Sequence, residues 1–297
     1  MAGYLRRTRQ AAKFDLMEKA QPSSYSALQK LLGSPPPWLA GVLNVTPDSF
    51  SDGGLFAEAE AALRQGLALL DAGAQLIDIG GESTGPGRSA VTAAEELRRI
   101  EALVAQLAPR CFVSIDTYKT QTARRCLELG ARMINDVSAL RAEPDLARIV
   151  AEHEAFIVLM YSKEAGTHPH ATRQEKEYED VVSDACTFLE QRVEYALACG
   201  IKKERIVIDP GMGGFISPEA AYSWKLLAGL QQIKERFVDF ALMIGTSRKG
   251  FLGGPLSERD ASSQLTAFAA FLKGADIIRT HNVSMAAEFF GRVKNER

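Results

Sequence analysis

The stretch AEAEAALRQGLALLDAGAQLIDIG, residues 57–80, shows the pattern that decides the fold. In its first part Leu63, Leu67 and Leu70 recur at spacings of four and three, which places them on one face of an α-helix. A short apolar run follows and contains one acidic residue, Asp78, close to its end. Such a run predicts a buried β-strand that carries a polar side chain near its carboxyl end.

The same pattern recurs along the chain from Trp38 onward. Apolar runs that predict strands lie at Leu39–Asn44, Gln75–Gly80, Cys111–Asp116, Arg132–Asp136, Phe156–Met160, Arg205–Asp209, Phe240–Gly245 and Asp276–Thr280. Amphipathic helical patterns fill 57–72, 92–107, 119–129, 176–199 and 258–273. No two successive strands are close enough for a two-residue hairpin, so we expect parallel strands joined by helical crossovers.

These repeated units predict the fold class, an α/β protein with a (β/α)8 TIM barrel and an N-terminal extension. A doubly wound open sheet is the alternative architecture. Before the first strand, Ser34-Pro35-Pro36-Pro37 predicts a stiff, extended linker, because proline fixes φ and disfavours helix in the preceding residue. We therefore expect residues 1–37 to form the extension and residues 38–297 to form the barrel.

Composition excludes several classes of protein. Of the 297 residues, 46% are hydrophobic, and no window has the roughly 18 uninterrupted apolar residues that span a bilayer. A net charge of −2 removes the usual electrostatic reason to expect nucleic-acid binding. The four cysteines show no C-x-x-C pair, which predicts free thiols in a reducing cytosol. The basic N-terminus is not followed by an apolar stretch, so we expect no secretory signal and a cytoplasmic protein.

Polar residues close seven of the eight predicted strands. They are Asn44, Asp78, Asp116-Thr117, Asn135-Asp136, Asp209, the run Thr246–Lys249 after the seventh strand, and Arg279-Thr280-His281-Asn282. Any one of them has an alternative explanation, since a polar residue after a strand often caps the next helix. In a barrel, however, the carboxyl ends of all strands meet at one mouth. The whole set therefore predicts a binding site at that mouth.

Three of these residues predict recognition of a flat polar ring. Asp116, Asn135 and Asp209 offer hydrogen-bond acceptors and an amide donor at adjacent levels of one cavity. That combination suits a heterocycle with N–H and exocyclic amine groups. Glycines at Gly53-Gly54 and Gly80-Gly81 mark loops that can bend over a ligand, or ordinary turns.

The last two strands predict an anion site. Lys249, Arg279 and His281 gather positive charge there, at the place where barrels commonly bind phosphate. At the end of the first strand, Asn44 and Asp48 supply hard oxygen ligands suited to magnesium bound to a diphosphate. The residues alone thus predict a barrel that binds a polar ring and an anion.

Two motifs carry a family resemblance. Gly41-Val-Leu-Asn-Val-Thr-Pro-Asp-Ser-Phe-Ser-Asp-Gly-Gly54 and Asp78-Ile-Gly-Gly-Glu-Ser-Thr84 resemble the dihydropteroate synthases, the sulfonamide targets of folate biosynthesis. The match continues in order through Ser114-Ile-Asp-Thr117, Ile134-Asn-Asp-Val137, Ile208-Asp-Pro-Gly211, Ser247-Arg-Lys249 and Arg279-Thr-His281. It covers residues 40–285. The resemblance implies a transferase that joins 6-hydroxymethyl-7,8-dihydropterin diphosphate to 4-aminobenzoate, giving 7,8-dihydropteroate and diphosphate.

The same resemblance implies a role for each matching residue. The catalytic groups would be Asp116, Asp209 and Lys249, and the pterin ring would contact Asp116, Asn135, Met160, Asp209 and Lys249. The diphosphate would contact Asn44, Thr84, Arg279 and His281, with Asn44 also binding the Mg²⁺ cofactor. Thr84, Ser247 and Lys249 would line the aminobenzoate side, where Phe215 would form the apolar wall. The resemblance also implies a homodimer through the later helices, although burial against the barrel explains the apolar residues of 258–273 equally well.

The sequence departs from the family pattern at three places. Gly85 replaces the usual loop arginine, and Arg88 either reaches back in its place or is a solvated loop residue. Gly214 stands where an aromatic residue is usual, and Phe215 follows one position later. Tyr161 stands where a histidine is usual. The last two departures resemble those of sulfonamide-insensitive members and predict an altered sulfonamide affinity.

Two other functions compete with the synthase. A catalytically silent paralogue that binds pterin would explain the loss of the loop arginine at Gly85. A corrinoid-linked methyltetrahydrofolate methyltransferase would keep the Asp and Asn contacts to the pterin. It would have no use for a magnesium–diphosphate site or for Ser247-Arg-Lys249.

Overall fold

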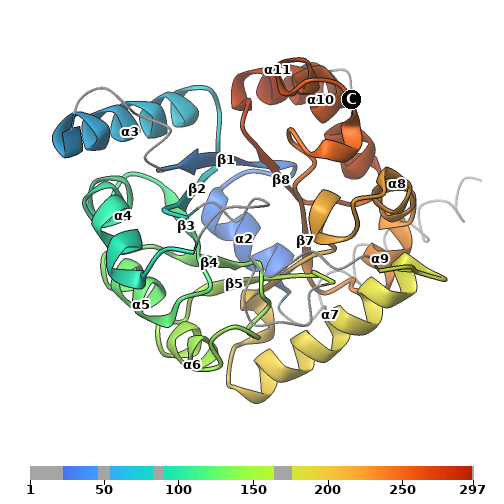
Figure 1. The fold of residues 1–297 in the computed structure, drawn as a ribbon, viewed down its shortest axis with the longest axis horizontal. Helices are drawn as coiled ribbons and strands as arrows, with labels where there is room; N and C mark the ends of the chain where they lie inside the picture. The colour runs from blue at the N-terminus through green and yellow to red at the C-terminus, as the bar shows by residue number, and fades with distance from the viewer. Residues whose placement is uncertain (1–22, 46–53, 83–89, 164–175, 296–297) are drawn as a thin grey trace, which may run out of the picture.

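The computed structural model describes residues 23–45, 54–82, 90–163 and 176–295, with the backbone alone for 54–58 and 292–295. Eight parallel strands close into a barrel in chain order, ringed by helices (Figure 1). The strands are β1 Trp38–Asn44, β2 Leu76–Gly80, β3 Phe112–Asp116, β4 Met133–Asp136, β5 Phe156–Met160, β6 Ile206–Asp209, β7 Ala241–Ile244 and β8 Ile277–Thr280. The (β/α)8 barrel is therefore confirmed, and the open sheet is excluded because β1 pairs with β8.

Helices follow each strand in turn. They are α3 Gly54–Asp71, α4 Ala93–Leu107, α5 Thr120–Glu128, α6 Asp145–Glu152, α7 Val181–Ala198, α8 Ala220–Ala228, α9 Leu230–Arg236, α10 Arg259–Leu272 and α11 Val283–Asn295. The prediction of a helix over 176–199 is wrong in its first turn. The helix begins at Val181 because the Asp180 carboxylate accepts the N–H groups of Val182 and Ser183, which caps it there.

The strands separate two apolar layers. Alternate side chains of a strand point to opposite faces, so one set packs outward on the helices and the other fills the barrel. The inward set forms its own cluster of Trp38, Ala40, Leu76, Phe112, Met133, Phe156, Val158, Val207, Ala241, Met243 and Ile277. These residues occupy the amino-terminal part of the barrel interior, which leaves the carboxyl ends of the strands for polar side chains.

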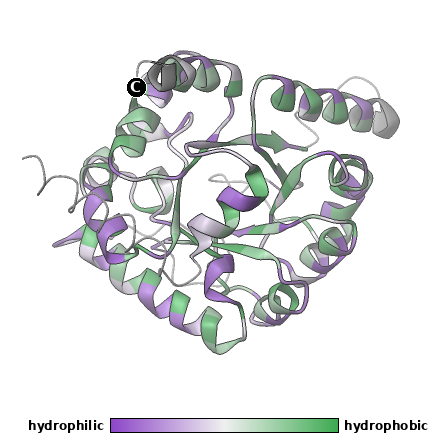
Figure 2. Ribbon diagram, turned by 180° about the vertical axis from the view of Figure 1, so that it is seen from behind, coloured by the Kyte–Doolittle hydropathy of each residue, from purple (hydrophilic) through white to green (hydrophobic). Residues whose placement is uncertain are grey.

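A short helix, α2 (Ser24–Leu32), closes the amino-terminal end of the barrel (Figures 1 and 2). Leu28 is fully buried in the inward cluster, and the Ser24 Oγ accepts the Ala241 N–H at 2.6 Å. The Trp38 Nε1 donates to the Ser34 carbonyl at 2.8 Å, which fixes the linker. Residues 23–37 thus dock on the barrel, a point that the sequence leaves open. The division at residue 37 stays a prediction, because residues 1–22 lie outside the described part.

Two further expectations concern the cysteines and the membrane. All four cysteines are free, with Cys126 and Cys186 buried and the other two partly exposed. Within the described residues, no helix has both the length and the apolar character needed to cross a membrane.

Candidate active site

A layer of polar side chains lies inside the barrel, directly above the inward apolar cluster. Asp78, Ser114, Asp116, Asn135, Asp209 and Arg279 follow apolar inward residues of the same strands at steps of two. All of them except Arg279 are buried, and its side chain is 20% exposed. The alternation of the strands therefore assembles six residues from five strands into one polar cavity floor.

Arg279 joins two carboxylates across this layer. Its Nε donates to Asp78 Oδ2 at 2.6 Å and its Nη2 to Asp116 Oδ2 at 2.7 Å. Burial opposes the positive charge, but the two carboxylates outweigh it and raise the pKa of Arg279 above its ordinary value. The guanidinium is thus permanently charged and fixed in place.

Asp78 belongs to the polar residues that predict the site, but the family resemblance assigns it no role. Besides Arg279, its carboxylate accepts the Ser114 hydroxyl at 2.6 Å and the Asn135 Nδ2 at 3.0 Å. These bonds fix the orientation of the Asn135 amide. Asp78 therefore positions two side chains of the polar layer, Asn135 and Arg279. The available signal was an acidic residue at an inward position of the otherwise apolar run Leu76–Gly80.

Asp116 has a buried oxygen without a partner. Its Oδ2 binds Arg279, but among the described atoms no group donates to its Oδ1. Burial raises the pKa of Asp116 to about 7, against the opposing effect of Arg279. A buried acceptor without a donor is costly, so this oxygen is ready to accept an N–H group from a ligand.

Asp209 lies at the end of β6, beside Met160 in the β5–β6 register. Its Oδ1 accepts the Gly211 N–H at 2.7 Å. Burial raises the pKa of Asp209 to about 6, while the Gly211 bond and the charges of Lys249 and Arg279 oppose the rise. Both side chains, Asp209 and Met160, are buried at the same level of the barrel.

Lys249 extends over the loop that follows β6. Its Nζ lies 4.5 Å from the centroid of the Phe215 ring. A Cβ at Gly213 would lie only 3.2 Å from Lys249 Cδ, so a glycine there leaves room for the lysine. Lys163 ties this loop to the end of β5, because its N–H donates to the Phe215 carbonyl at 3.0 Å and its Nζ to the Gly214 carbonyl at 3.1 Å.

Ser247 and His281 form a pair at the ends of β7 and β8. The Ser247 Oγ lies 3.0 Å from His281 Nδ1 and accepts the His281 backbone N–H at 3.2 Å. Burial, together with the charges of Arg279, Arg248 and Lys249, lowers the pKa of His281 to about 3. The lowered pKa favours the neutral form of His281, so the positive charge near the last two strands comes from Arg279 and Lys249. A neutral imidazole here serves as a hydrogen-bonding group.

Asn44 is exposed at the end of β1, and its side chain lies next to Gly80 and near Asp116. A Cβ at Gly80 would lie 3.4 Å from Asn44 Oδ1 and 3.5 Å from Asp116 Cβ. Among the described residues, no group of three or more His, Cys, Asp or Glu side chains is placed to hold a metal ion. Mg²⁺ keeps several waters and often binds through one or two protein ligands and substrate phosphates. A lone amide oxygen fits magnesium that arrives with a diphosphate. Thr84, Asp48, Gly85 and Arg88 lie outside the described residues.

The chain resembles known proteins over most of its length. A family model described as pterin-binding enzyme matches residues 40–281. The chain belongs to this family. A dihydropteroate synthase of Streptococcus pyogenes is 37% identical over 258 residues, which are 84% of this chain and 92% of that protein.

Solved structures of the pterin-binding family agree with this assignment. The dihydropteroate synthase of Xanthomonas albilineans with 4-aminobenzoic acid has a TM-score of 0.79 and 37% identity, covering 87% of this chain and 92% of that one. Another structure of the enzyme from the same organism, in complex with 7,8-dihydropteroate, has a TM-score of 0.75 and 34% identity. It covers 87% of this chain and 93% of that one.

This pterin-binding enzyme also has a buried charge cluster that sequence reasoning missed. Lys119 forms ion pairs with Glu82 and with Glu96, the second at 3.2 Å, and Thr122 Oγ1 donates to Glu96 at 2.8 Å. All four side chains are buried, and burial raises the pKa of Glu96. The cluster fastens the end of β2 to α4 and to the residues after β3. It thereby holds together the segments that follow β2 and β3 at the carboxyl end of the barrel.

Proposed function

We propose that this chain is a dihydropteroate synthase. It condenses 6-hydroxymethyl-7,8-dihydropterin diphosphate with 4-aminobenzoate and releases 7,8-dihydropteroate and diphosphate. The observation that carries the proposal is the buried Asp116 Oδ1, which has no donor among the described atoms and lies in a layer with Asn135 and Arg279. That layer offers acceptors and an amide to one flat polar ring, and a fixed cation, Arg279, to the group attached to it.

In this proposal the pterin ring lies on the polar layer. Asp116 and Asp209 accept N–H groups of the ring, and the Asn135 amide, held by Asp78, meets its polar edge. Met160 supplies an apolar contact at the level of Asp209. Lys249 lies above this floor and bridges the pterin to the second substrate.

The diphosphate then projects toward the mouth. Arg279 supplies a positive charge and His281 a hydrogen-bonding group, and Asn44 lies at the end of the neighbouring strand β1. We include Thr84 in this contact set by its place in the family motif. Magnesium, when bound with the substrate at Asn44, would stabilise the negative charge of the departing diphosphate.

The chemistry is an alkyl transfer. The bond between the pterin methylene and the diphosphate oxygen breaks, and the oxygen leaves with the electron pair. The neutral aniline nitrogen attacks the methylene with its lone pair, and the resulting ammonium centre then releases one proton to water. Positive charge develops on the dihydropterin as the bond breaks, and the carboxylates of Asp116 and Asp209 compensate it. Positioning of two bound substrates supplies most of the remaining acceleration.

The aminobenzoate occupies the space above Lys249. The Phe215 ring forms an apolar wall against the benzene ring, with Lys249 Nζ at 4.5 Å from its centroid. Ser247 supplies a hydroxyl on the same side, next to His281. Thr84 completes this side by its place in the motif.

Assembly and location are proposals as well. We propose a cytoplasmic homodimer in which the exposed apolar residues of α10 contribute to the interface. Leu265 and Leu272 on this helix are 63% and 58% exposed and lie seven positions apart, on the same face of the helix. Size-exclusion chromatography with light scattering tests the dimer, and a monomer would contradict it.

The first test of the activity is product formation from the dihydropterin diphosphate and labelled 4-aminobenzoate. The assay is run with magnesium and again with magnesium chelated. Labelled dihydropteroate that depends on magnesium supports the synthase. Pterin binding by calorimetry without any product would favour the silent paralogue instead.

A further inference from the structure

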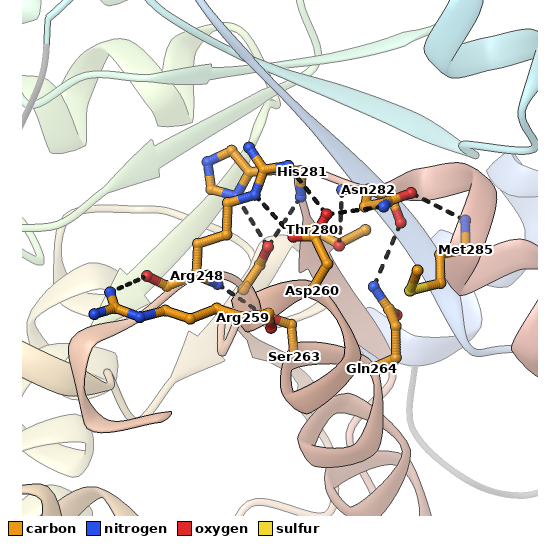
Figure 3. Close-up of polar contacts among 10 residues, drawn as sticks. Arg248, Arg259, Asp260, Ser263, Gln264, Thr280, His281, Asn282 and Met285 are labelled. Carbon is orange, nitrogen blue, oxygen red and sulfur yellow. Dashed lines mark hydrogen bonds and ion pairs between the residues drawn. The ribbon is translucent and has the colours of Figure 1, made fainter. Parts of the chain in front are cut away.

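One carboxylate on α10 contacts the loops that follow both β7 and β8 (Figure 3). Asp260 accepts two bonds from Arg248, Nε to Oδ1 at 2.9 Å and Nη2 to Oδ2 at 3.2 Å. Its Oδ2 also accepts the Asn282 Nδ2 at 2.9 Å. Arg248 lies between Ser247 and Lys249, and Asn282 follows His281 directly. The two partners of Asp260 are therefore sequence neighbours of three residues of the proposed site.

The loop after β7 needs an external support at Arg248. This residue has φ +58°, in the left-handed region that non-glycine residues adopt at a cost. Three contacts from α10 hold it there. Its N–H donates to Ser263 Oγ at 3.0 Å, its carbonyl accepts Arg259 Nη1 at 3.2 Å, and its side chain binds Asp260. This backbone turn determines where Lys249 leaves the barrel wall.

The loop after β8 is held through Asn282. Its Oδ1 accepts the Met285 N–H at 3.1 Å in the first turn of α11, and its carbonyl accepts Gln264 Nε2 at 3.5 Å. The bond to Asp260 completes the set of contacts of this side chain in Figure 3. Since His281 is bonded to Ser247 of the other loop, movement of Asn282 would disturb that pair.

We propose that Asp260 is a positioning residue of the substrate site. By binding Arg248 and Asn282 at the same time, it keeps Ser247, Lys249 and His281 in their productive relation. This inference rests on the proposed synthase function for the identity of the substrates. The Arg248 and Asp260 side chains are 39% and 24% exposed, so their ion pair adds little to folding stability. Its effect is on the geometry of the site.

The test compares Asp260→Asn, Asp260→Glu and the wild type. Asp260→Asn keeps the shape but loses the charge that holds Arg248. We expect kcat/KM for the dihydropterin diphosphate to fall on the order of tenfold, mostly through KM, because small displacements of binding groups are costly. We expect the unfolding temperature to fall by less than about 3 °C. Asp260→Glu keeps the charge and should recover part of kcat/KM. Glu258→Gln, an exposed change two residues away, is the matched control and should behave as wild type.

A second experiment separates positioning from a general structural effect. If Asp260 acts through Arg248, then Asp260→Asn combined with Arg248→Gln loses no more activity than the worse single variant. Losses that multiply would overturn the proposed route. An unfolding temperature that falls while kcat and KM stay at wild-type values would overturn the positioning role.

A third experiment keeps this inference separate from the proposed function. Binding of inorganic diphosphate to wild type and to Asp260→Asn is measured by calorimetry, without turnover. Weaker binding by the variant supports the positioning role even if the wild type makes no dihydropteroate. Equal binding contradicts it, whatever the activity assay gives.

Discussion

The guanidinium of Arg279 on β8 holds the carboxylate of Asp116 on β3, 163 residues away, with Nη2 and Oδ2 2.7 Å apart. This bond leaves the second oxygen of Asp116 buried and without a donor among the described atoms. The ion pair therefore fixes the orientation of the carboxylate and leaves Oδ1 of Asp116 available as an acceptor for a ligand. The first three predictions follow from this arrangement.

Asp116→Asn should remove most of the turnover and leave the fold intact. The amide keeps the volume but loses the negative charge that compensates the developing pterin cation. We expect kcat to fall on the order of a hundredfold or more. Steady-state kinetics measures the loss, and circular dichroism checks the fold. A variant with normal kcat would contradict the role of Asp116.

Arg279→Met should destabilise the protein strongly. Removing the guanidinium leaves two buried carboxylates, Asp78 and Asp116, without their charged partner, and breaking a buried pair in this way costs about 3–5 kcal/mol. Arg279→Lys keeps the charge and should cost less. Urea unfolding monitored by fluorescence gives both values. Equal stability of the Met variant and the wild type would show that the two ion pairs of Arg279 do not contribute to the free energy of unfolding.

Pterin binding should strengthen as pH rises from 6 to 8. The carboxylates must be ionised to accept ring N–H groups, and burial raises the pKa of Asp116 to about 7 and that of Asp209 to about 6. Calorimetry with the pterin substrate between pH 5.5 and 8.5 tests this window. In Asp116→Asn the dependence near pH 7 should disappear. A flat profile in the wild type would contradict the assignment.

The same two pKa values predict a stability profile. An aspartate in an unfolded chain has a pKa of about 3.9. Between pH about 4 and 7 the folded protein therefore holds more protons on Asp116 and Asp209 than the unfolded chain does. Their contribution to the free energy of unfolding should fall as pH rises through that window. Denaturant melts of wild type and Asp116→Asn measure the difference, and parallel profiles would refute it.

Gly211→Ala should be more destabilising than Gly200→Ala. Both glycines have positive φ, +69° and +89°, so alanine costs about 1–2 kcal/mol at either site. At Gly211 the new Cβ would also overlap the Tyr161 carbonyl oxygen, whereas nothing lies within 4 Å at Gly200. We expect a further loss of roughly 1–3 kcal/mol at Gly211. Activity should fall as well, because the Gly211 N–H binds Asp209. Similar unfolding curves for the two variants would count against the close contact.

Phe215→Ala should weaken the use of 4-aminobenzoate. The variant removes the proposed apolar wall and the ring that lies 4.5 Å from Lys249 Nζ. Loss of a cation–π contact and of apolar area at a partly exposed site corresponds to about a tenfold rise in KM for aminobenzoate. The KM for the pterin diphosphate should change little. A rise confined to the pterin substrate would place Phe215 elsewhere.

The strands and their polar ends were predictable because they depend on local pattern. All eight strands occur where the apolar runs lie, with ends within one residue of those expected. Asp116, Asn135, Asp209 and Arg279 meet inside the barrel because a closed parallel sheet has one carboxyl end. The period of two along each strand is enough to place them there.

Other features depend on partners far along the chain and carry no local signal. Glu96 on α4 is buried beside Thr117, Lys119 and Thr122, which approach it from the region after β3. The lowered pKa of His281 follows from burial beside the cations Arg279, Arg248 and Lys249, an arrangement that depends on the three-dimensional fold. In the sequence, Asp260 resembles any aspartate in the first turn of a helix. Its role depends on contacts with two loops, through Arg248 after β7 and Asn282 after β8.

The helix that closes the amino-terminal end of the barrel has a consequence for how the chain folds. α2 precedes every strand, yet its Ser24 hydroxyl accepts a hydrogen bond from the N–H of Ala241, 217 residues later. That contact can form only after β7 exists, so the earliest described element of the chain must wait for almost the whole length to be synthesised. Contacts of such high sequence separation slow folding. The final closure of this barrel end is therefore a late event, in which the first and last thirds of the chain meet.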